Sequence, residues 1–282
     1  MDYDVVENLR YALQGVDLVI STIPGAEQLN LIDAARRARV RVFVPSEFEG
    51  DLDRRPANDP LDRGSQSALQ LLESWSQANS YRLRYTVFSC GIFMERFGPG
   101  GLQTHGMGGG SGMQGPDDYL VNIHEARAEI ISTNLSGRPV RISLTSVYDV
   151  AQFITAAIEL GLDTWPKEFR MRGDSVTVQE LVEACSNALG GELPRNLSVP
   201  CRRLTDVVTV PIRLVTRHYQ EVEAQAEACQ QREDWAQWNY FQMLLQTANG
   251  RYHVRQPNLD GASQVQPPAF IEWLKNVWVC SL

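Results

Sequence analysis

The sequence is poor in basic residues and has no long apolar run. Its 282 residues include 26 Lys and Arg against 34 Asp and Glu, which gives a net charge of −8. Nucleic-acid binding calls for a basic surface, so this charge argues against a nucleic-acid partner. No stretch approaches the ~20 consecutive apolar residues of a membrane helix, and no membrane partner is expected.

Paired cysteines, a secretory start and metal-ligand spacings are also missing. The cysteines are odd in number and far apart, at Cys90, Cys185, Cys201, Cys229 and Cys280. Together with the Met-Asp-Tyr-Asp start, which has no signal-peptide character, they predict reduced thiols in a cytoplasmic protein. The histidines have no neighbours at metal-ligand spacing, so no metal site is predicted.

What the sequence does contain is an alternation of short apolar runs with amphipathic segments. Residues 16–21, 40–44 and 84–89 are typical of buried strands, and residues 26–38 and 65–78 have the apolar period of a helix. Strand, helix and strand at this spacing predict a parallel sheet. The first half of the chain therefore belongs to the doubly wound α/β class.

The central stretch of this half runs from Val40 to Gly50. Pro45 cannot donate to a sheet ladder and ends the strand, so Ser46, Glu47 and Phe48 lie beyond its carboxyl end. Open α/β sheets bind their ligands at that edge. Glu47 is either a carboxylate in a pocket or the acceptor of a hydrogen bond within the loop.

The second half has a glycine-rich break and further helices. The segment from Gly98 to Gly115 is either a phosphate-binding loop or, because no strand precedes it and no helix follows, a loop at the rim of a pocket. Thr177 and Glu180 form the pattern of a capping box. Further patterns predict a strand at 140–144, a helix at 147–160, a strand at 169–172, one long helix at 221–247 and a last helix at 267–279.

Several motifs together carry a family likeness. The motifs are Gly15-Val16-Asp17-Leu18-Val19-Ile20-Ser21, Leu31-Ile32-Asp33-Ala34-Ala35, Val40-Arg41-Val42-Phe43-Val44-Pro45-Ser46-Glu47-Phe48, Gly91-Ile92-Phe93, Tyr148-Asp149-Val150-Ala151 and Glu272-Trp273-Leu274. They resemble the NmrA-like and isoflavone-reductase-like branch of the atypical short-chain dehydrogenases, most of all its fungal members. The resemblance covers nearly the whole chain.

The resemblance implies a Rossmann-like doubly wound parallel sheet and a small C-terminal α+β substrate domain. The first domain would span residues 1–97, with residues 140–160 returning to it, and residues 98–282 would form mainly the second. The implied cofactor is NADP or NAD. The residues implied to bind it are Ser21, Thr22, Ile23, Pro24, Pro45, Ser46, Glu47, Phe48, Gly91 and Phe93.

Two features depart from the family pattern. The first is the expected lack of roughly fifty residues at the start of the family pattern. These residues would form the glycine-rich βαβ unit that holds the cofactor pyrophosphate, and a further strand. The chain is then either a shortened form or one without the family's dinucleotide binding. An exposed sheet edge would lower its stability and offer a surface for a homodimer.

The second departure concerns catalysis. The resemblance implies a lysine early in the helix after the Pro-Ser-Glu-Phe loop, and Ser65 stands at that position; no lysine precedes Lys167. Ser65 is the candidate at the family's catalytic position, although a serine without an activating base is a poor proton donor. His124 is a second candidate for acid/base chemistry, or else a surface residue at the start of a helix.

Four functions remain open from the sequence. The first is an NAD(P)H-dependent reductase of a small aromatic or polyketide-like molecule. The second is a non-catalytic NmrA-like dinucleotide sensor or regulator. The third is a protein whose pocket binds a metabolite for non-redox chemistry, and the fourth is a degenerate paralogue.

Overall fold

The computed structural model describes residues 2–108, 119–123, 125–190, 212–261 and 264–279. It divides into two compact units. The first contains Met1–Cys90, Ala151–Met171 and Arg255–Val265. The second contains Gly91–Val150, Arg172–Val254 and Gln266–Leu282.

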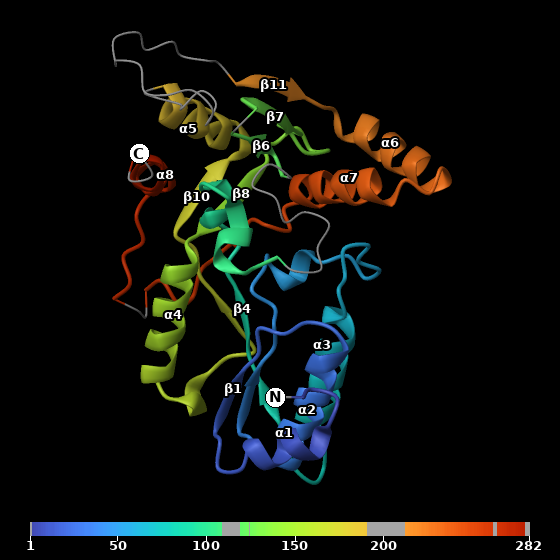
Figure 1. Cartoon of the computed structure of the whole chain (residues 1–282), viewed down its shortest axis with the longest axis vertical. Coiled ribbons are helices and arrows are strands. Elements are labelled where there is room, and N and C mark those ends of the chain that lie inside the picture. Colours follow the sequence, from blue (N-terminus) through green and yellow to red (C-terminus); the bar gives the residue numbers. More distant parts are fainter. Residues whose placement is uncertain (1, 109–118, 124, 191–211, 262–263, 280–282) are drawn as a thin grey trace. The chain divides into compact units, whose positions relative to one another are not determined.

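The first unit begins with the predicted alternation of helices and strands. Its first elements are α1 (Val6–Ala12), β1 (Leu18–Ile20), α2 (Ala26–Arg37), β2 (Val42–Val44), α3 (Ser65–Ser76) and β3 (Arg84–Tyr85). The order β1-β2-β3 is parallel throughout, so β2 is the central strand. In Figure 1 the helices α1, α2 and α3 lie on one side of these strands and α4 (Val147–Glu159) on the other.

A second parallel ladder completes this unit, formed by β4 (Val87–Ser89) and β9 (Glu168–Arg170). The sequence predicts one strand over 84–89, and the structure corrects this. The N–H of Thr86 still donates to the carbonyl of Phe43 in β2 (3.1 Å), whereas the N–H of Val87 donates to that of Lys167 (2.9 Å). One apolar run therefore serves two ladders.

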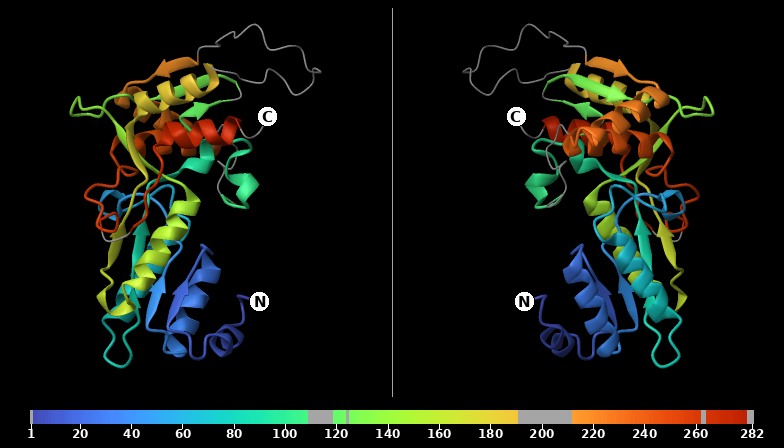
Figure 2. Two further views of the ribbon diagram at one scale, coloured as in Figure 1. Left: turned by 90° about the vertical axis from the view of Figure 1, so that its left-hand side faces the viewer. Right: turned by 90° about the vertical axis from the view of Figure 1, so that its right-hand side faces the viewer.

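The core of the first unit lies between α1, α2, α3 and the strands. Its buried members are Leu9, Val19, Leu31, Ile32, Ala34, Ala35, Val40, Phe43, Ala68, Leu72 and Leu83. Six of these eleven residues lie on α2 and α3, the two segments whose apolar period predicts a helix. The close packing of α1 on α2 is visible in both side views of Figure 2.

The second unit is a mixture of short sheets and helices. Its strands are β5 (Ile92–Phe93), β6 (Val121–Asn122), β7 (Arg127–Ile130), β8 (Arg141–Thr145), β10 (Asp174–Thr177) and β11 (Arg213–Thr216). Its helices are α5 (Val178–Gly190), α6 (Tyr219–Gln231), α7 (Trp235–Ala248) and α8 (Phe270–Val279). One sheet has the order β10-β8-β5, in which β10 runs antiparallel to β8 and β5 runs parallel to it. The other has the order β11-β7-β6, in which β11 runs parallel to β7 and β6 runs antiparallel to it.

The prediction of one long helix over 221–247 is wrong. The structure has two helices, α6 and α7, which pack against each other (Figure 1). Glu233 has a φ of 58°, and the side chain of Asp234 accepts the N–H of Gln237 (3.3 Å) at the start of α7. A left-handed residue followed by a capping aspartate ends one helix and begins another.

Candidate functional site

The turn after β1 is fixed by its own serine. The N–H of Ser21 donates to the carbonyl of Val44 (2.8 Å), which continues the β1–β2 ladder. The Oγ of Ser21 accepts the N–H of Ile23 (3.3 Å) and donates to its carbonyl (3.2 Å). Thr22 and Pro24 are exposed, and α2 follows at once from Gly25.

The loop after β2 is attached to α2. Pro45 is buried, and the N–H of Ser46 donates to Oε1 of the buried Gln28 at 2.6 Å. Phe48 stacks on Phe88 of β4, with ring centroids 6.4 Å apart. The loops at the carboxyl ends of β1 and β2 are therefore held in defined positions in the first unit.

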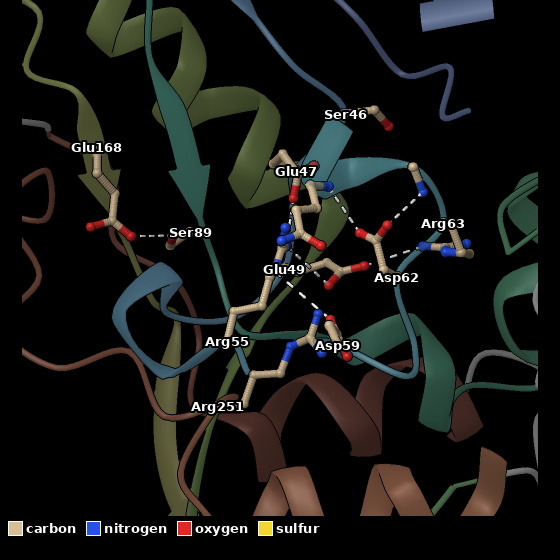
Figure 3. A network of polar contacts seen from close by, with 12 residues as sticks. Ser46, Glu47, Glu49, Arg55, Asp59, Asp62, Arg63, Ser89, Glu168 and Arg251 are labelled. Atoms are coloured by element: carbon tan, nitrogen blue, oxygen red, sulfur yellow. Dashed lines mark hydrogen bonds and ion pairs between the residues drawn. The ribbon is translucent and has the colours of Figure 1, made fainter. Parts of the chain in front are cut away.

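A buried ion-pair network lies in this loop. Nη2 of Arg55 lies 2.5 Å from Oε2 of Glu47 and 3.7 Å from Glu49, and Nε lies 4.0 Å from Asp59. The Glu47 side chain has no exposed surface and that of Arg55 is 10% exposed. Figure 3 shows the three carboxylates gathered around the one guanidinium. Among the described residues no three His, Cys, Asp or Glu side chains could hold a metal ion.

Burial dominates the acidity of Glu47. Removal from water raises the pKa of its carboxyl above the usual 4.5, against the opposing effects of Arg55 and of the Ser65 hydroxyl. Within the described residues, Oε1 of Glu47 and Nη1 of Arg55 are buried without a well-formed hydrogen bond. Each of these atoms is therefore available for a further polar contact.

The start of α3 completes this group of residues. The carboxylate of Asp62 accepts the N–H of Gly64 (3.1 Å) and of Gln66 (2.9 Å), which caps the helix. Gly64 has a φ of 90°, and a Cβ there would lie 3.1 Å from the Cα of Gly25. The turn after β1 and the first turn of α3 thus come together through two glycines, and Ser65 is the first residue of the helix.

The other predicted site residues are not part of this group. Gly91 and Phe93 belong to the second unit. Gly91 has a φ of 78°, and a Cβ there would lie 2.3 Å from the carbonyl oxygen of Ser143. The close packing of this residue against β8 is therefore sufficient to explain why it is a glycine. Phe93 pairs with Thr145 in the ladder of β5 and β8. His124 lies outside the described residues.

Sequence patterns missed the residues that support the site. Arg55 directly precedes Pro56 in a polar loop, and nothing in that loop marks it as the partner of Glu47. Gln28 lies on a helix face that otherwise supplies core residues. Only the positive φ of Gly64, next to a predicted helix start, could have been anticipated from the residue type.

The comparison with protein families identifies the group to which the chain belongs. Residues 1–248 match the model of the NmrA-like family. The chain is therefore a member of the NmrA-like family.

Solved structures share the fold at low identity. An isoflavone reductase is 18% identical and gives a TM-score of 0.63 over 98% of this chain and 80% of that one. Leucoanthocyanidin reductase from Vitis vinifera, in a ternary complex, is 15% identical with a TM-score of 0.62 over 98% and 84%. An NADPH-dependent quinone oxidoreductase from Escherichia coli, complexed with NADPH, is 13% identical with a TM-score of 0.61 over 99% and 82%. These similarities establish the Rossmann-like α/β fold predicted from the sequence.

One relative is similar in sequence over a shorter stretch. A protein of Aspergillus flavus named oxidoreductase aprR is 37% identical over 97 residues. These residues are 33% of this chain and 31% of the relative, so the match spans about a third of the relative's length. Separately, no helix in the described part of the chain is long and apolar enough to cross a membrane.

Proposed function

We propose that this chain is an NAD(P)H-dependent oxidoreductase that reduces a small aromatic or polyketide-like metabolite. One observation carries the proposal: the turn after β1, the loop after β2 and the start of α3 meet in one group at the carboxyl ends of parallel strands. That edge is where open α/β sheets bind nucleotides and substrates. Membership of the NmrA-like family, and the NADPH that the Escherichia coli neighbour binds, support the same conclusion.

The residues present fit a nicotinamide nucleotide at this edge. The helix α2 begins at Gly25 without a side-chain cap, so its first N–H groups can donate to a polar ligand. Residues 21–24 and 45–48 would line the nucleotide, with Thr22, Pro24 and Ser46 offering accessible surface. The bound cofactor would supply the hydride. The protein would bind and orient the substrate and would supply the proton.

Proton supply falls to Ser65 and Glu47. Ser65 is half-buried, and its hydroxyl is close enough to Glu47 to affect the pKa of that carboxyl. A carboxyl whose pKa lies above the usual range holds its proton nearer to neutral pH, which suits an acid in reduction. In this proposal Ser65 donates to the substrate oxygen and Glu47 replaces the proton, while Arg55 fixes the orientation of the carboxyl.

A second candidate is a regulator that binds the dinucleotide without turnover. Ser65 stands where the family resemblance implies a lysine, and no lysine occurs before Lys167. A serine hydroxyl cannot provide the ammonium charge of a lysine. This observation favours a protein in which cofactor binding is kept and catalysis is lost.

NADPH binding and oxidation by the purified chain separate the two candidates. We expect quenching of tryptophan fluorescence on NADPH addition, and oxidation of NADPH with a member of a panel of quinones and aromatic ketones. Ser65→Ala and Glu47→Gln should each lower kcat about a hundredfold with little change in the Kd for NADPH. Ser67→Ala, an exposed serine on the same helix, is the matched control.

Three outcomes decide the proposal. Oxidation that depends on Ser65 but not on Ser67 supports the reductase. Binding without oxidation of any compound in the panel supports the regulator. The absence of binding at millimolar NADPH overturns both.

A further inference from the structure

Of the three carboxylates around Arg55, one reaches the solvent. The side chain of Glu47 has no exposed surface and that of Asp59 is 2% exposed, whereas that of Glu49 is 28% exposed. On its outer side Glu49 pairs with Arg63, whose side chain is 42% exposed, at 3.2 Å between Oε1 and Nη2. Glu49 therefore connects the buried part of the network to the surface of the first unit.

Glu49 is held in this position by its main chain and by its side chain. The N–H of Cys90, the residue after β4, donates to the carbonyl of Glu49 (2.8 Å). Oε2 of Glu49 lies 3.7 Å from Nη2 of Arg55, the same nitrogen that contacts Glu47 at 2.5 Å. One guanidinium nitrogen thus contacts both the fully buried carboxylate and the one that reaches the solvent (Figure 3).

The charges that face Glu47 come from the loop after β2 and from α3. The titratable and charged groups that act on it are Arg55, Glu49 and Asp59 of the loop and the hydroxyl of Ser65. The neighbouring elements have other partners. Gln28 of α2 is neutral and binds the N–H of Ser46, the carboxylate of Asp62 is bound by the first turn of α3, and Glu168 of β9 accepts the hydroxyl of Ser89 (2.5 Å).

The negative charge of Glu49 acts in the same direction as burial. Removal from water is the largest effect that raises the pKa of Glu47, Arg55 and Ser65 oppose it, and the charge of Glu49 raises the pKa further. Glu49 also shares the guanidinium of Arg55 with Glu47. Both effects favour the protonated form of Glu47.

We propose that Glu49 is a positioning residue that sets the pH range in which Glu47 resupplies the proton of Ser65. This inference rests on the function proposed above, in which Ser65 protonates the substrate and Glu47 replaces that proton. The carboxylate of Glu49 acts through Arg55 and through its own charge, and it touches neither the substrate nor the cofactor. Arg63 offsets part of that charge from the solvent side.

The pH dependence of NADPH oxidation by Glu49→Gln tests this role. Since the proposed reaction requires protonated Glu47, kcat falls as the pH rises through the pKa of that carboxyl. Loss of the neighbouring negative charge lowers this pKa, so the fall should occur about half a pH unit or more lower than in the wild-type chain. Glu49→Asp keeps the charge and should restore the wild-type profile. Arg63→Gln removes the offsetting charge and should move the fall in the opposite direction.

A second measurement does not depend on turnover. In a chain labelled with ¹³C at the glutamate carboxyls, the NMR signal that is missing from Glu47→Gln identifies Glu47, and its titration gives the pKa of that group. We expect the same downward shift in Glu49→Gln and an upward shift in Arg63→Gln. Asp53→Asn removes the same charge from an exposed position of the same loop and should change neither measurement.

The two measurements separate this inference from the proposed function. If the wild-type chain oxidises NADPH and Glu49→Gln has the wild-type pH profile, the role of Glu49 is refuted and the reductase stands. If the wild-type chain oxidises no NADPH, the titration of Glu47 alone decides the role of Glu49. An even loss of kcat at every pH with an unchanged titration, or an equal shift in Asp53→Asn, would also overturn the inference. If Glu49→Gln fails to fold, Arg63→Gln provides the test.

Discussion

Glu47 and Arg55 form an ion pair, 2.5 Å from Oε2 to Nη2, in which the carboxylate side chain is completely buried. Glu47 lies near the start of the loop that leads from β2 to α3, and Arg55 lies near its middle. Burial of both charges is costly unless they remain paired. The pair therefore stabilises the course of the loop and, through it, the position of Ser65.

Loss of Arg55 should destabilise the first unit. Arg55→Gln leaves Glu47 buried without its counter-charge, and we expect a loss of about 3 kcal/mol in the free energy of unfolding at pH 7. Chemical denaturation measures this quantity. Arg54→Gln, at an exposed neighbouring position, is the control and should be nearly neutral. Equal effects of the two substitutions would show that the pair contributes no stability.

The raised pKa of Glu47 predicts a specific pH dependence. The native state holds this proton more tightly than the unfolded chain, so the associated stability is fully present below the usual carboxyl pKa of 4.5. It is lost as the pH rises through the raised pKa. Relative to Glu47→Gln, the wild-type chain should therefore become less stable from pH 4 to pH 7. Glu27→Gln at an exposed position should show no such trend, and a parallel pH profile for Glu47→Gln and wild type would refute the shift.

A side chain at position 64 should be poorly tolerated. Gly64→Ala places a Cβ on a left-handed backbone and only 3.1 Å from the Cα of Gly25. We therefore expect the free energy of unfolding to fall by about 2 kcal/mol or more. Gly137→Ala is the matched control because Gly137 has a φ of 70° and no atom within 4 Å of its Cβ. Gly137→Ala should lower the free energy of unfolding by about 1 kcal/mol, because only the backbone strain contributes. If both variants lose the same stability, the contact with Gly25 is unimportant.

Local patterns were sufficient to predict much of the fold. The predicted helix over 26–38 is found at Ala26–Arg37, and the three strands of the first sheet run parallel as expected. The capping box is confirmed in both directions, with the N–H of Thr177 bound to Glu180 (2.6 Å) and that of Glu180 bound to Thr177 (3.0 Å). Each of these features depends on residues a few positions apart.

Features that depend on distant residues were not predictable in this way. The pairing of Glu47 with Arg55 depends on the path of a loop that has no periodic pattern. The change of partner at Thr86 depends on where Phe43 and Lys167 lie in the folded chain. Both are set by tertiary packing, which hydrophobic periodicity does not encode.

The break between α6 and α7 was missed for a different reason, and it leads to a further prediction. Glu233 occupies the left-handed position after α6, where glycine is the usual residue, and the N–H of Asp234 donates to the carbonyl of Cys229 (2.9 Å). Glycine and proline, the usual markers of a helix end, are both missing here, so the helical period alone predicts one continuous helix. Glu233→Gly should therefore relieve backbone strain and raise the free energy of unfolding by about 0.5–1 kcal/mol.

The control for this substitution lies six residues earlier, on α6. Glu227→Gly replaces an exposed glutamate in the middle of the helix and should lower the free energy of unfolding by about 1 kcal/mol, because glycine disfavours a helix interior. The same chemical change thus has opposite signs at two positions, which urea denaturation of the two variants measures directly. A loss of stability in both variants would show that residue 233 belongs to a continuous helix.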